Sequence, residues 1–437
     1  MTPAEFYKNY FTPGTITTDS RKTGKGSVFV ALKGDTFNGN DFAVHALNSG
    51  ASLVVVDEKI ELSDERVIMV SNTLTFLQEL ANYHRVQNKF HVIGLTGTNG
   101  KTTTKELIHS VLSERYNVKS TRGNLNNHIG VPLTLLSIEP DTDIVVIEMG
   151  ANHAGEIRAL CDIAYPDSGL ITNIGVAHLE GFGSFEGVKK AKGELYEYIK
   201  TQKGVLYCNG TDQTLREMIG TYDNCKFYNS DDGLCTGRII STYPFLKAEI
   251  TSNTQSVLIH THLFGTYNLL NILASASVAI DHGIDLGAVK RGIEKFKPSN
   301  FRSQILQIGS CTVILDCYNA NPSSMEQAIR NVVEYEGSRK ILILGSMKEL
   351  GSYSHHEHQK LTEFAESYDF DTIILFGSEF ESIRSTKSHH TNSIDEIIHY
   401  LDTLDLRDSL ILIKGSRANK MERLKEAIEN HHSSSIS

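Results

Sequence analysis

FHVIGLTGTNGKTTT, residues 90–104, decides how the middle of this chain folds. Residues 92–95 form a short apolar strand, and the glycines around it free the backbone to turn its N–H groups toward an anion. Lys101 adds a point charge, Thr102 adds a hydroxyl that can reach Mg²⁺, and the helix that begins at once adds its positive dipole end. The stretch therefore predicts a strand, a phosphate-binding loop (P-loop) for ATP, and a helix.

The glycine spacing of this loop is unusual. The common spacing, GxxxxGK[ST], would require glycine at position 95, where this chain has Leu95. The glycines at 94, 97 and 100 are instead three apart, as GxxGxxGKT, a variant that indicates a particular group of ATP-dependent ligases. The loop residues expected to bind ATP are Gly97, Thr98, Asn99, Gly100, Lys101, Thr102 and Thr103.

The composition is that of an ordinary globular protein. With 437 residues, 40% of them hydrophobic and 22% charged, the chain is long enough for two or three domains. Its net charge of −10 argues against nucleic acid as a main partner, because a phosphate backbone requires a basic surface. Six cysteines without CxxC spacing are expected to be reduced thiols, as in the cytoplasm. No apolar run approaches about 18 residues and no export signal is recognisable, so neither a membrane span nor secretion is expected.

Three segments differ in pattern, and together they predict an α/β protein of three domains. Residues 1–88 carry short strands with helices between them, which predicts a small α/β domain. In residues 89–297, near-continuous apolar strands alternate with helices, as in a mostly parallel sheet, and residues 222–262 weaken into stretches that indicate an antiparallel edge. In residues 298–437 the alternation restarts, which predicts a second, Rossmann-like sheet.

Three side chains beyond the P-loop are candidates for metal binding. Glu148 ends an apolar strand, and a carboxylate there commonly holds Mg²⁺ beside a P-loop; the alternative is a solvated acid. His178 follows the next strand, where it either ligates a second metal or is a structural loop histidine. On the following helix, Lys189, Lys190 and Lys192 form a solvated face, unless burial leaves one of them as a reactive neutral amine.

Side-chain amides gather in two places. Asn124, Asn126 and Asn127 suit a sugar or an amide-rich substrate, and equally an Asx-turn loop. Asn268 and Asn271 lie three residues apart on the first turn of a helix. There they could frame the edge of a purine, or Asn268 could simply cap the helix.

In the last segment, charged residues follow the domain junction and two strand ends. Arg302 comes just after the junction, and Asp316 ends a strand where an acid can bond ribose hydroxyls or cap a loop. Lys414 and Arg417, in KGSR, are either anion contacts or ordinary surface cations. HHEH, residues 355–358, has the composition of a metal site, but a solvated cluster that caps a helix is expected.

Taken together, these segments resemble the Mur ligase family over nearly the whole chain. The motifs that carry the resemblance occur in the family's order and approximate spacing. They are TGTNGKTTT, the glutamate of VIEMGA, NIGVAHLEGFGS, AKGELY, GTYNLLN, FRSQ, DCYNANP and KGSR. One motif departs, because the family's LGDMxELG reads LGSMKELG here, with Ser346 in place of the aspartate.

The resemblance implies what each segment does. Residues 1–88 would bind a UDP-linked substrate, residues 89–297 would bind ATP, and residues 298–437 would form the Rossmann-like domain. The implied activity is ATP-dependent amide ligation through an acyl phosphate in peptidoglycan precursor synthesis, with ATP and Mg²⁺, in the cytoplasm. A monomer is expected, although no motif decides the oligomeric state.

Within the family, the chain is most similar to the member that joins D-alanyl-D-alanine to UDP-N-acetylmuramoyl-tripeptide. GNLNNHIGVP and YNANP are typical of that member, and the DNPR motif of members that add meso-diaminopimelate is absent. The third residue of the tripeptide, diaminopimelate or lysine, stays open. Two alternatives also remain: a ligase that adds a single third amino acid to UDP-N-acetylmuramoyl-dipeptide, and a P-loop nucleotide switch that ligates nothing.

The resemblance also implies roles for residues at matching positions. Lys101 would bind the β- and γ-phosphates, and Thr102 and Glu148 the first Mg²⁺. His178 and Lys192 would serve a second metal, with Lys192 carbamylated by CO₂, so that Lys101, His178 and Lys192 would be the catalytic residues. Those implied around the adenine, ribose and phosphates are Asn268, Asn271, Asp316 and Arg302. Those implied at the other substrates are Ser20, Arg21, Asn124, Asn126, Asn127, His128, Asn319, Lys414 and Arg417.

Overall fold

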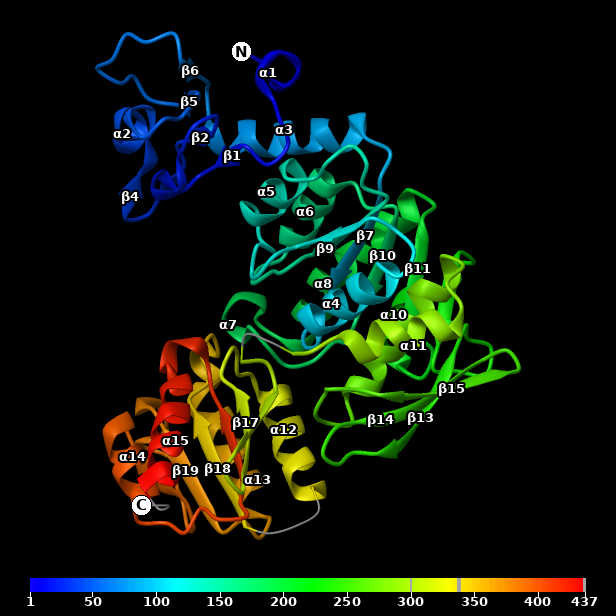
Figure 1. Cartoon of the computed structure of the whole chain (residues 1–437), viewed down its shortest axis with the longest axis vertical. Helices are drawn as coiled ribbons and strands as arrows, with labels where there is room; N and C mark the ends of the chain where they lie inside the picture. Colours follow the sequence, from blue (N-terminus) through cyan, green and yellow to red (C-terminus); the bar gives the residue numbers. More distant parts are fainter. Residues whose placement is uncertain (299–300, 336–338, 435–437) are drawn as a thin grey trace.

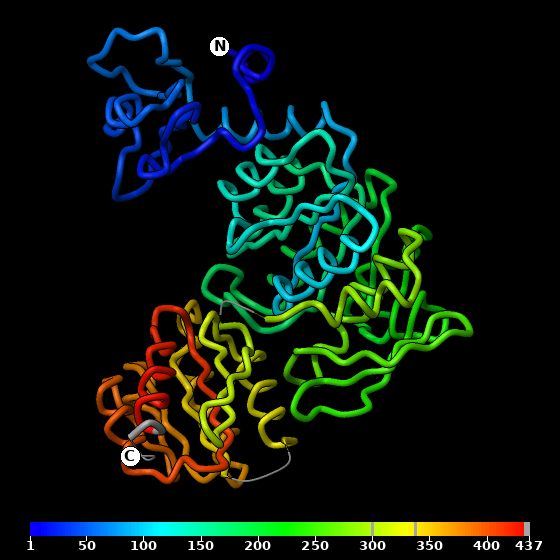
Figure 2. Tube along the Cα trace, in the orientation of Figure 1, coloured from blue at the N-terminus to red at the C-terminus, as the bar shows by residue number. Residues whose placement is uncertain are grey.

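The computed structural model of the protein describes residues 1–298, 301–335 and 339–434. Its strands form separate sheets in the three predicted segments of the chain (Figure 1). The Cα trace in Figure 2 places the N-terminal and C-terminal segments at opposite ends of the molecule, with the central segment between them. No helix in these described ranges is both long and apolar enough to cross a membrane.

The N-terminal segment is the predicted small α/β domain, and its sheet is parallel with the order β1-β2-β5-β6. The loop after β2 contains the short hairpin β3–β4. The strands are β1 (Ile16–Thr17), β2 (Val28–Val30), β3 (Lys33–Gly34), β4 (Phe37–Asn38), β5 (Leu53–Val56) and β6 (Val67–Met69). The helices are α1 (Pro3–Tyr10), α2 (Ala43–Asn48) and α3 (Thr73–Gln87).

The central segment is built on a parallel sheet in the order β12-β11-β10-β7-β9-β8. Its strands are β7 (His91–Thr96), β8 (Val118–Ser120), β9 (Ile144–Glu148), β10 (Ser168–Ile171), β11 (Val205–Asn209) and β12 (Cys225–Tyr228). Its helices are α4 (Lys101–Leu112), α5 (Gly130–Leu136), α6 (Glu156–Ala164), α7 (Leu179–Phe182), α8 (Phe185–Thr201), α9 (Gln213–Ile219), α10 (Asn268–Asp281) and α11 (Leu286–Lys295).

Helices cover both faces of this sheet because successive strand residues point to opposite faces. Val92 packs with α5, α6 and α8 on one face, and Ile93 packs with α4, α10 and α11 on the other. The apolar cluster that contains Val92 also includes Leu77 of α3, and α3 packs against α5 and α6. The apolar core is therefore continuous across the domain boundary that we predict between residues 88 and 89.

The expectation of antiparallel strands in residues 222–262 is right in type and wrong in place. β13 (Thr236–Ser241), β14 (Lys247–Ser252) and β15 (Gln255–His260) form their own antiparallel sheet, and the edge of the central sheet is the parallel strand β12. The buried residues of β14 alternate with less buried ones, so this sheet packs one face against the helices α10 and α11.

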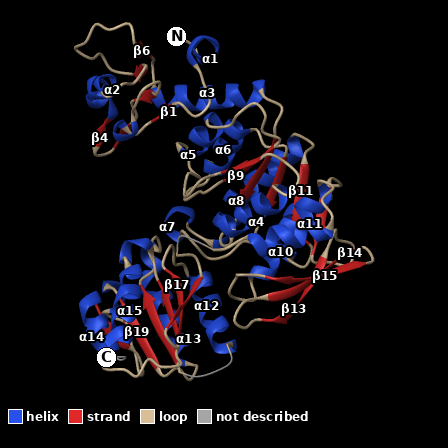
Figure 3. Cartoon of the chain, in the orientation of Figure 1, coloured by secondary structure: helices blue, strands red, loops and turns tan. Residues whose placement is uncertain are grey.

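The C-terminal segment has the predicted Rossmann-like pattern, in the order β16-β17-β21-β18-β19-β20. Its strands are β16 (Gln304–Ile308), β17 (Cys311–Asp316), β18 (Lys340–Gly345), β19 (Thr372–Phe376), β20 (His389–Thr391) and β21 (Leu410–Lys414). Its helices are α12 (Pro322–Glu334), α13 (Ser354–Glu366), α14 (Ile394–Asp402) and α15 (Leu424–Ser434). Side chains of α12 and α13 belong to the apolar cluster on one face of the sheet and those of α14 and α15 to the cluster on the other. Figure 3 shows these helices beside the strands of the C-terminal segment. β16 pairs antiparallel with β17, whereas the other pairs are parallel.

Candidate active site

The carboxyl ends of strands in the central and C-terminal sheets face one cavity of about 770 Å³. Ligands of open α/β sheets collect at this edge, and the volume is in the usual range for small-molecule sites. The predicted residues that line the cavity are Thr98, Asn99, Gly100, Lys101, Thr102, Thr103, Asn124, Asn126, Asn127, His128, Glu148, His178, Asn268, Asn271, Arg302, Asp316, Asn319 and Lys414. Side chains from two domains thus meet at one place, although the chain separates them widely.

The other predicted residues are outside this lining, in the part of the chain that the structure describes. They are Ser20, Arg21, Gly97, Lys192 and Arg417. Ser20 and Arg21 belong to the N-terminal domain, where the Arg21 side chain is 87% exposed and pairs with Asp19 at 2.8 Å. Their contact with a UDP-linked substrate stays a prediction.

Close contacts explain why the P-loop needs its glycines. Gly97 and Gly100 both have positive φ, +149° and +77°. A Cβ atom at Gly97 would collide with the hydroxyl of Thr172, and one at Gly100 would collide with the amide oxygen of Asn271. Only glycine fits at these two positions without strain.

Lys101 folds back over its own loop. Its Nζ donates to the carbonyl of Gly97 at 2.7 Å and to that of Thr98 at 3.0 Å. Desolvation lowers the pKa of Lys101 to about 8, with Arg302 acting in the same direction and Glu148 opposing it. Burial therefore destabilises the Lys101 ammonium, and a phosphate bound at the loop would provide the negative charge that stabilises it.

Glu148 is a buried carboxylate, only 1% exposed, between the P-loop helix and the amide-rich loop. Thr102 Oγ1 donates to its Oε2, and Asn126 Nδ2 donates to its Oε1, both at 2.9 Å. The main-chain N–H of Glu148 donates to Thr121 Oγ1 at 2.9 Å. A carboxylate and a hydroxyl beside a P-loop are the hard oxygen donors that Mg²⁺ prefers, so this donor set fits the predicted metal.

His178 reaches the C-terminal domain. Its Nδ1 contacts Glu349 Oε2, and this hydrogen bond holds the pKa of Glu349 below its ordinary value. The main-chain N–H of Glu180 also donates to the carbonyl of Glu349 at 3.3 Å. His178 therefore lies at the interface between two domains, and its role toward a second metal stays a prediction.

Lys192 is not part of a solvated face. It is 1% exposed, whereas the neighbouring Lys190 is exposed. Desolvation lowers the pKa of Lys192 well below its ordinary value, and the nearby ammonium of Lys101 acts in the same direction. Its Nζ lies 5.8 Å from the centre of the Phe182 ring. Burial thus favours the neutral amine, the form that reacts with CO₂.

The two amide groups of α10 pair with each other. Asn271 Nδ2 donates to Asn268 Oδ1 at 2.8 Å, and Asn268 Nδ2 donates to the carbonyl of Phe264 at 2.6 Å. Thr104 of the P-loop helix donates to Asn271 Oδ1 at 3.1 Å. The alternative that Asn268 caps α10 is wrong, because it is the first helical residue and its side chain turns back to the preceding loop.

The amide-rich loop, residues 124–128, fits both interpretations in part: it contains an Asx turn, and it also contains side chains that face the cavity. Asn127 Oδ1 accepts from the main-chain N–H groups of Ile129 and Gly130, at 3.2 and 2.8 Å, so it forms an Asx turn. Asn126 instead contacts the candidate metal ligand Glu148. Asn124 and His128 line the cavity.

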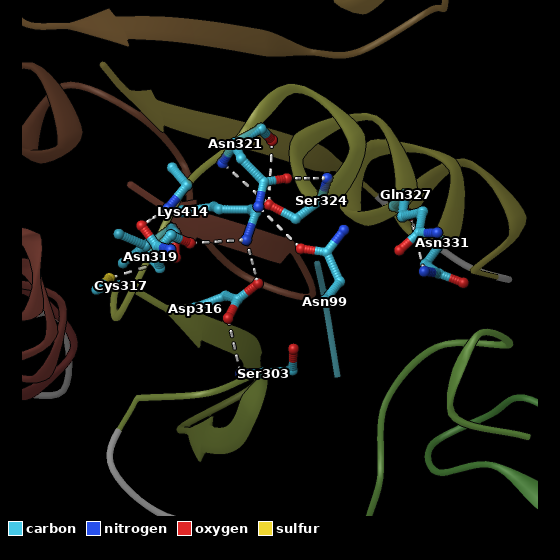
Figure 4. Close-up of polar contacts among 12 residues, drawn as sticks. Asn99, Ser303, Asp316, Cys317, Asn319, Asn321, Ser324, Gln327, Asn331 and Lys414 are labelled. Carbon is cyan, nitrogen blue, oxygen red and sulfur yellow. Dashed lines mark hydrogen bonds and ion pairs between the residues drawn. The ribbon is translucent and has the colours of Figure 1, made fainter. Parts of the chain in front are cut away.

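Asp316 and Lys414 form a pair at the ends of the neighbouring strands β17 and β21 (Figure 4). Lys414 Nζ donates to Asp316 Oδ2 at 2.6 Å and lies 3.3 Å from the carbonyl of Asn319. Asp316 Oδ1 accepts from the main-chain N–H of Ser303 at 3.1 Å. Lys414 is 2% exposed, so the alternative of an ordinary surface cation is wrong for this residue.

Two guanidinium groups lie against one tyrosine ring at the cavity. The Arg302 guanidinium is 3.5 Å from the centre of the Tyr318 ring, and that of Arg417 is 5.7 Å from it. Arg302 is also close enough to Lys101 to affect its pKa. The predicted position of Arg302 across the interdomain cleft from the P-loop is consistent with this proximity.

His358 and Ser346, which do not line the cavity, are both buried. The expectation that HHEH is solvated is wrong for His358, which is fully buried and accepts at Nε2 from the Met347 main-chain N–H at 3.0 Å. Across the described residues, no cluster of three or more His, Cys, Asp or Glu side chains could hold a metal ion. Ser346 is buried at the end of β18, where its hydroxyl accepts from Asn419 Nδ2 at 3.1 Å.

The sequence did not indicate several of the residues that line the cavity. Among them are Tyr267, Ser303, Tyr318, Ser324 and Gln327. The two tyrosines and Ser303 lie inside the motifs GTYNLLN, DCYNANP and FRSQ, which was a usable signal. Ser324 and Gln327 carry no local signal, because only the docking of α12 against the P-loop brings them to the cavity.

Three family models match consecutive parts of the chain. Residues 14–85 match the Mur ligase family catalytic domain, residues 95–279 match the Mur ligase middle domain, and residues 301–428 match the Mur ligase glutamate ligase domain.

Curated relatives and solved structures agree with these matches. The UDP-N-acetylmuramoyl-tripeptide--D-alanyl-D-alanine ligase of Escherichia coli is 35% identical, over 95% of this chain and 94% of its own. The Bacillus subtilis protein of the same name is 34% identical, over 95% and 93%. MurF of Acinetobacter baumannii superposes with a TM-score of 0.88 at 30% identity, over 98% of each chain. MurF of Thermotoga maritima, solved in complex with ADP, has a TM-score of 0.86 at 29% identity, over 96% and 98%.

Proposed function

The chain belongs to the Mur ligase family, and from this membership we propose that it joins D-alanyl-D-alanine to UDP-N-acetylmuramoyl-tripeptide with ATP. The products are the extended UDP-linked peptide, ADP and phosphate. Relatives that carry this activity in their names align along almost the whole chain. Peptidoglycan precursor synthesis in the cytoplasm is part of the proposal.

One observation in the site carries the proposal. The P-loop and Glu148 of the central domain share a single cavity with Arg302 and the Asp316–Lys414 pair of the C-terminal domain. A nucleotide switch needs only the first of these two sets. Acyl phosphate chemistry needs a second substrate beside the terminal phosphate of ATP, and an interdomain cavity provides room for both.

The reaction makes an amide from a carboxylate and an amine. A carboxylate is a poor electrophile, so the terminal carboxylate of the UDP-linked tripeptide first takes the γ-phosphoryl group of ATP. The free amine of D-alanyl-D-alanine then attacks the acyl carbon, and phosphate leaves as the tetrahedral intermediate collapses. Lys101 and Arg302, which line the same cavity, would stabilise the charge of the transferring phosphoryl group.

Two metal sites and the C-terminal domain would support this chemistry. Mg²⁺, held by Thr102 and Glu148, would neutralise phosphate charge. Lys192, as a carbamate, and His178 would serve a second metal. The C-terminal domain covers the P-loop side of the cavity and would exclude the water that hydrolyses an acyl phosphate.

Phosphate release tests the proposed function against both alternatives. We expect release only when UDP-N-acetylmuramoyl-tripeptide, ATP and D-alanyl-D-alanine are all present. Turnover with the UDP-linked dipeptide and a single diamino acid, but not with D-alanyl-D-alanine, would favour the ligase that adds a third residue. Nucleotide binding without turnover on either substrate pair would favour the switch.

We expect ATP binding to take up protons above about pH 8. The pKa of free Lys101 is lowered to about 8, so above that pH the side chain is increasingly neutral. Bound phosphates favour the ammonium and raise this pKa, so binding must take up a proton between the two values and must weaken as the pH rises. Calorimetry of ATP binding at pH 8.5–9, in two buffers of different ionisation enthalpy, measures the uptake.

Lys101→Met is the control for this uptake, because it removes the titrating amine and keeps the length of the side chain. Proton uptake that persists in Lys101→Met would assign the uptake to another group.

A further inference from the structure

The side chain of Asn99 joins the P-loop to the C-terminal domain (Figure 4). Its Nδ2 donates to Ser323 Oγ at 2.8 Å, and its Oδ1 accepts from Asn321 Nδ2 at 2.9 Å. Both partners lie at the start of α12, more than 220 positions along the chain. An amide has one acceptor atom and one donor atom, so the C-terminal domain uses both ends of this side chain.

The backbone of Asn99 is held from the other side. Its N–H donates to Asn173 Oδ1 at 3.0 Å, and its carbonyl accepts from Asn173 Nδ2 at 3.0 Å and from Thr172 Oγ1 at 2.6 Å. Both partners lie just beyond β10 of the central domain. Asn99 is therefore fixed by the central domain through its main chain and by the C-terminal domain through its side chain.

The two residues that contact Asn99 lie at the N-terminus of α12, where one of them caps the helix. Asn321 caps α12, since its Oδ1 accepts from the Ser324 N–H at 2.9 Å while its Nδ2 reaches Asn99. Ser323 approaches the central domain closely, because a Cβ atom at Gly175 would lie 3.0 Å from its hydroxyl. The placement of α12 and the placement of the P-loop apex are therefore coupled through Asn99.

We propose that Asn99 is a positioning residue that couples docking of the C-terminal domain to the shape of the P-loop. Asn99 lies between Thr98 and Gly100, which also line the cavity, so a shift of α12 moves the backbone that faces the phosphates. The same docking brings Arg302 and Asp316 to that cavity. Its kinetic consequence rests on the proposed ligase function, whereas the docking itself does not.

Asn321→Ser separates this coupling from both ATP binding and helix stability. Serine caps a helix about as well as asparagine, but its hydroxyl is too short to reach Asn99. The set to compare is wild type, Asn321→Ser, Asn99→Ala and the double variant. Ser324→Ala is the matched control for Tm, because it removes the other half of the capping box and none of the contacts of Asn99; its kcat is not compared, since Ser324 lines the cavity.

For each protein, kcat, the Kd for ATP and Tm are measured. We expect kcat of Asn321→Ser to fall about three- to tenfold, the loss typical of one hydrogen bond, while its Kd for ATP changes less than about twofold. The kcat of the double variant should be at most about twofold lower than that of Asn99→Ala, because both substitutions remove the same hydrogen bond between Asn99 and Asn321. Unchanged kcat in Asn321→Ser, or effects that multiply in the double variant, would overturn the proposal.

Two further measurements cover the cases in which Asn321→Ser is destabilised or the wild type shows no turnover. If Asn321→Ser has a lower Tm than Ser324→Ala, Ser323→Ala takes its place, since it removes the other contact of Asn99 and one hydrogen bond to Asn321 Oδ1, but keeps the capping bond from the Ser324 N–H. If the wild type shows no turnover, the proposed function fails, and solution scattering still tests the docking. Asn321→Ser should then have a larger radius of gyration than wild type, and an equal radius would sink the proposal.

Discussion

Lys192→Ala should reduce ligation by about a hundred- to a thousandfold, the loss typical of removing one charge-stabilising group from an active site. Lys192 is 1% exposed, and burial lowers its pKa well below its ordinary value, which favours the neutral amine, the form that attacks CO₂. The carbamate would supply a carboxylate-like oxygen ligand that alanine cannot. Steady-state phosphate release with all three substrates measures the loss.

Lys190→Ala is the matched control for this prediction, because Lys190 is on the same helix and exposed, and it should keep full activity. A carbamate also has a specific signature, since short carboxylic acids such as acetate can occupy the space left by the alanine. Partial recovery of Lys192→Ala by acetate, and none of any other slow variant, is therefore expected. Wild-type rates in Lys192→Ala would exclude the carbamate.

Glu148→Gln should lower turnover by about a hundredfold or more and raise the Mg²⁺ concentration needed for half-maximal rate. The change keeps the shape of the side chain and removes its charge. The carboxylate is 1% exposed and is oriented by Thr102 and Asn126, so a bound cation is the partner that would compensate a charge buried there. A Mg²⁺ titration of the initial rate measures both effects.

Glu139→Gln is the control, because Glu139 is an exposed acid on the same domain whose ion pair with Lys119 is at the surface. It should leave the Mg²⁺ dependence unchanged. Equal Mg²⁺ curves for wild type and Glu148→Gln would remove Glu148 from the metal site.

The P-loop and the strand ends were predictable because their chemistry is local in the chain. Gly97, Gly100, Lys101 and Thr102 lie within six positions, and the strand before them fixes the edge of the sheet at which they lie. Glu148 was predicted at the same edge by the rule that parallel strands end together, and it lines the same cavity.

The predictions that were wrong or left open concern side chains whose surroundings come from other elements. Lys414 could be read as a surface cation, because no sequence neighbour indicates that Asp316 lies 2.6 Å away. His358 was expected in solvent, yet it packs edge-on against Phe380, 4.7 Å between ring centres, and accepts from the Met347 main chain. Composition alone does not show which face of a helix is buried.

Sequence alone was enough for the order of the domains, the phosphate loop and the membership of one family, since each depends on residues that are close together or on motifs in the order typical of the family. The junctions between domains needed tertiary structure. Asn99 meets Asn321 across 222 positions, and His178 meets Glu349 across the same domain boundary. Such contacts depend on how two separately folded sheets dock, and no local spacing or periodicity records the relative orientation of two rigid bodies.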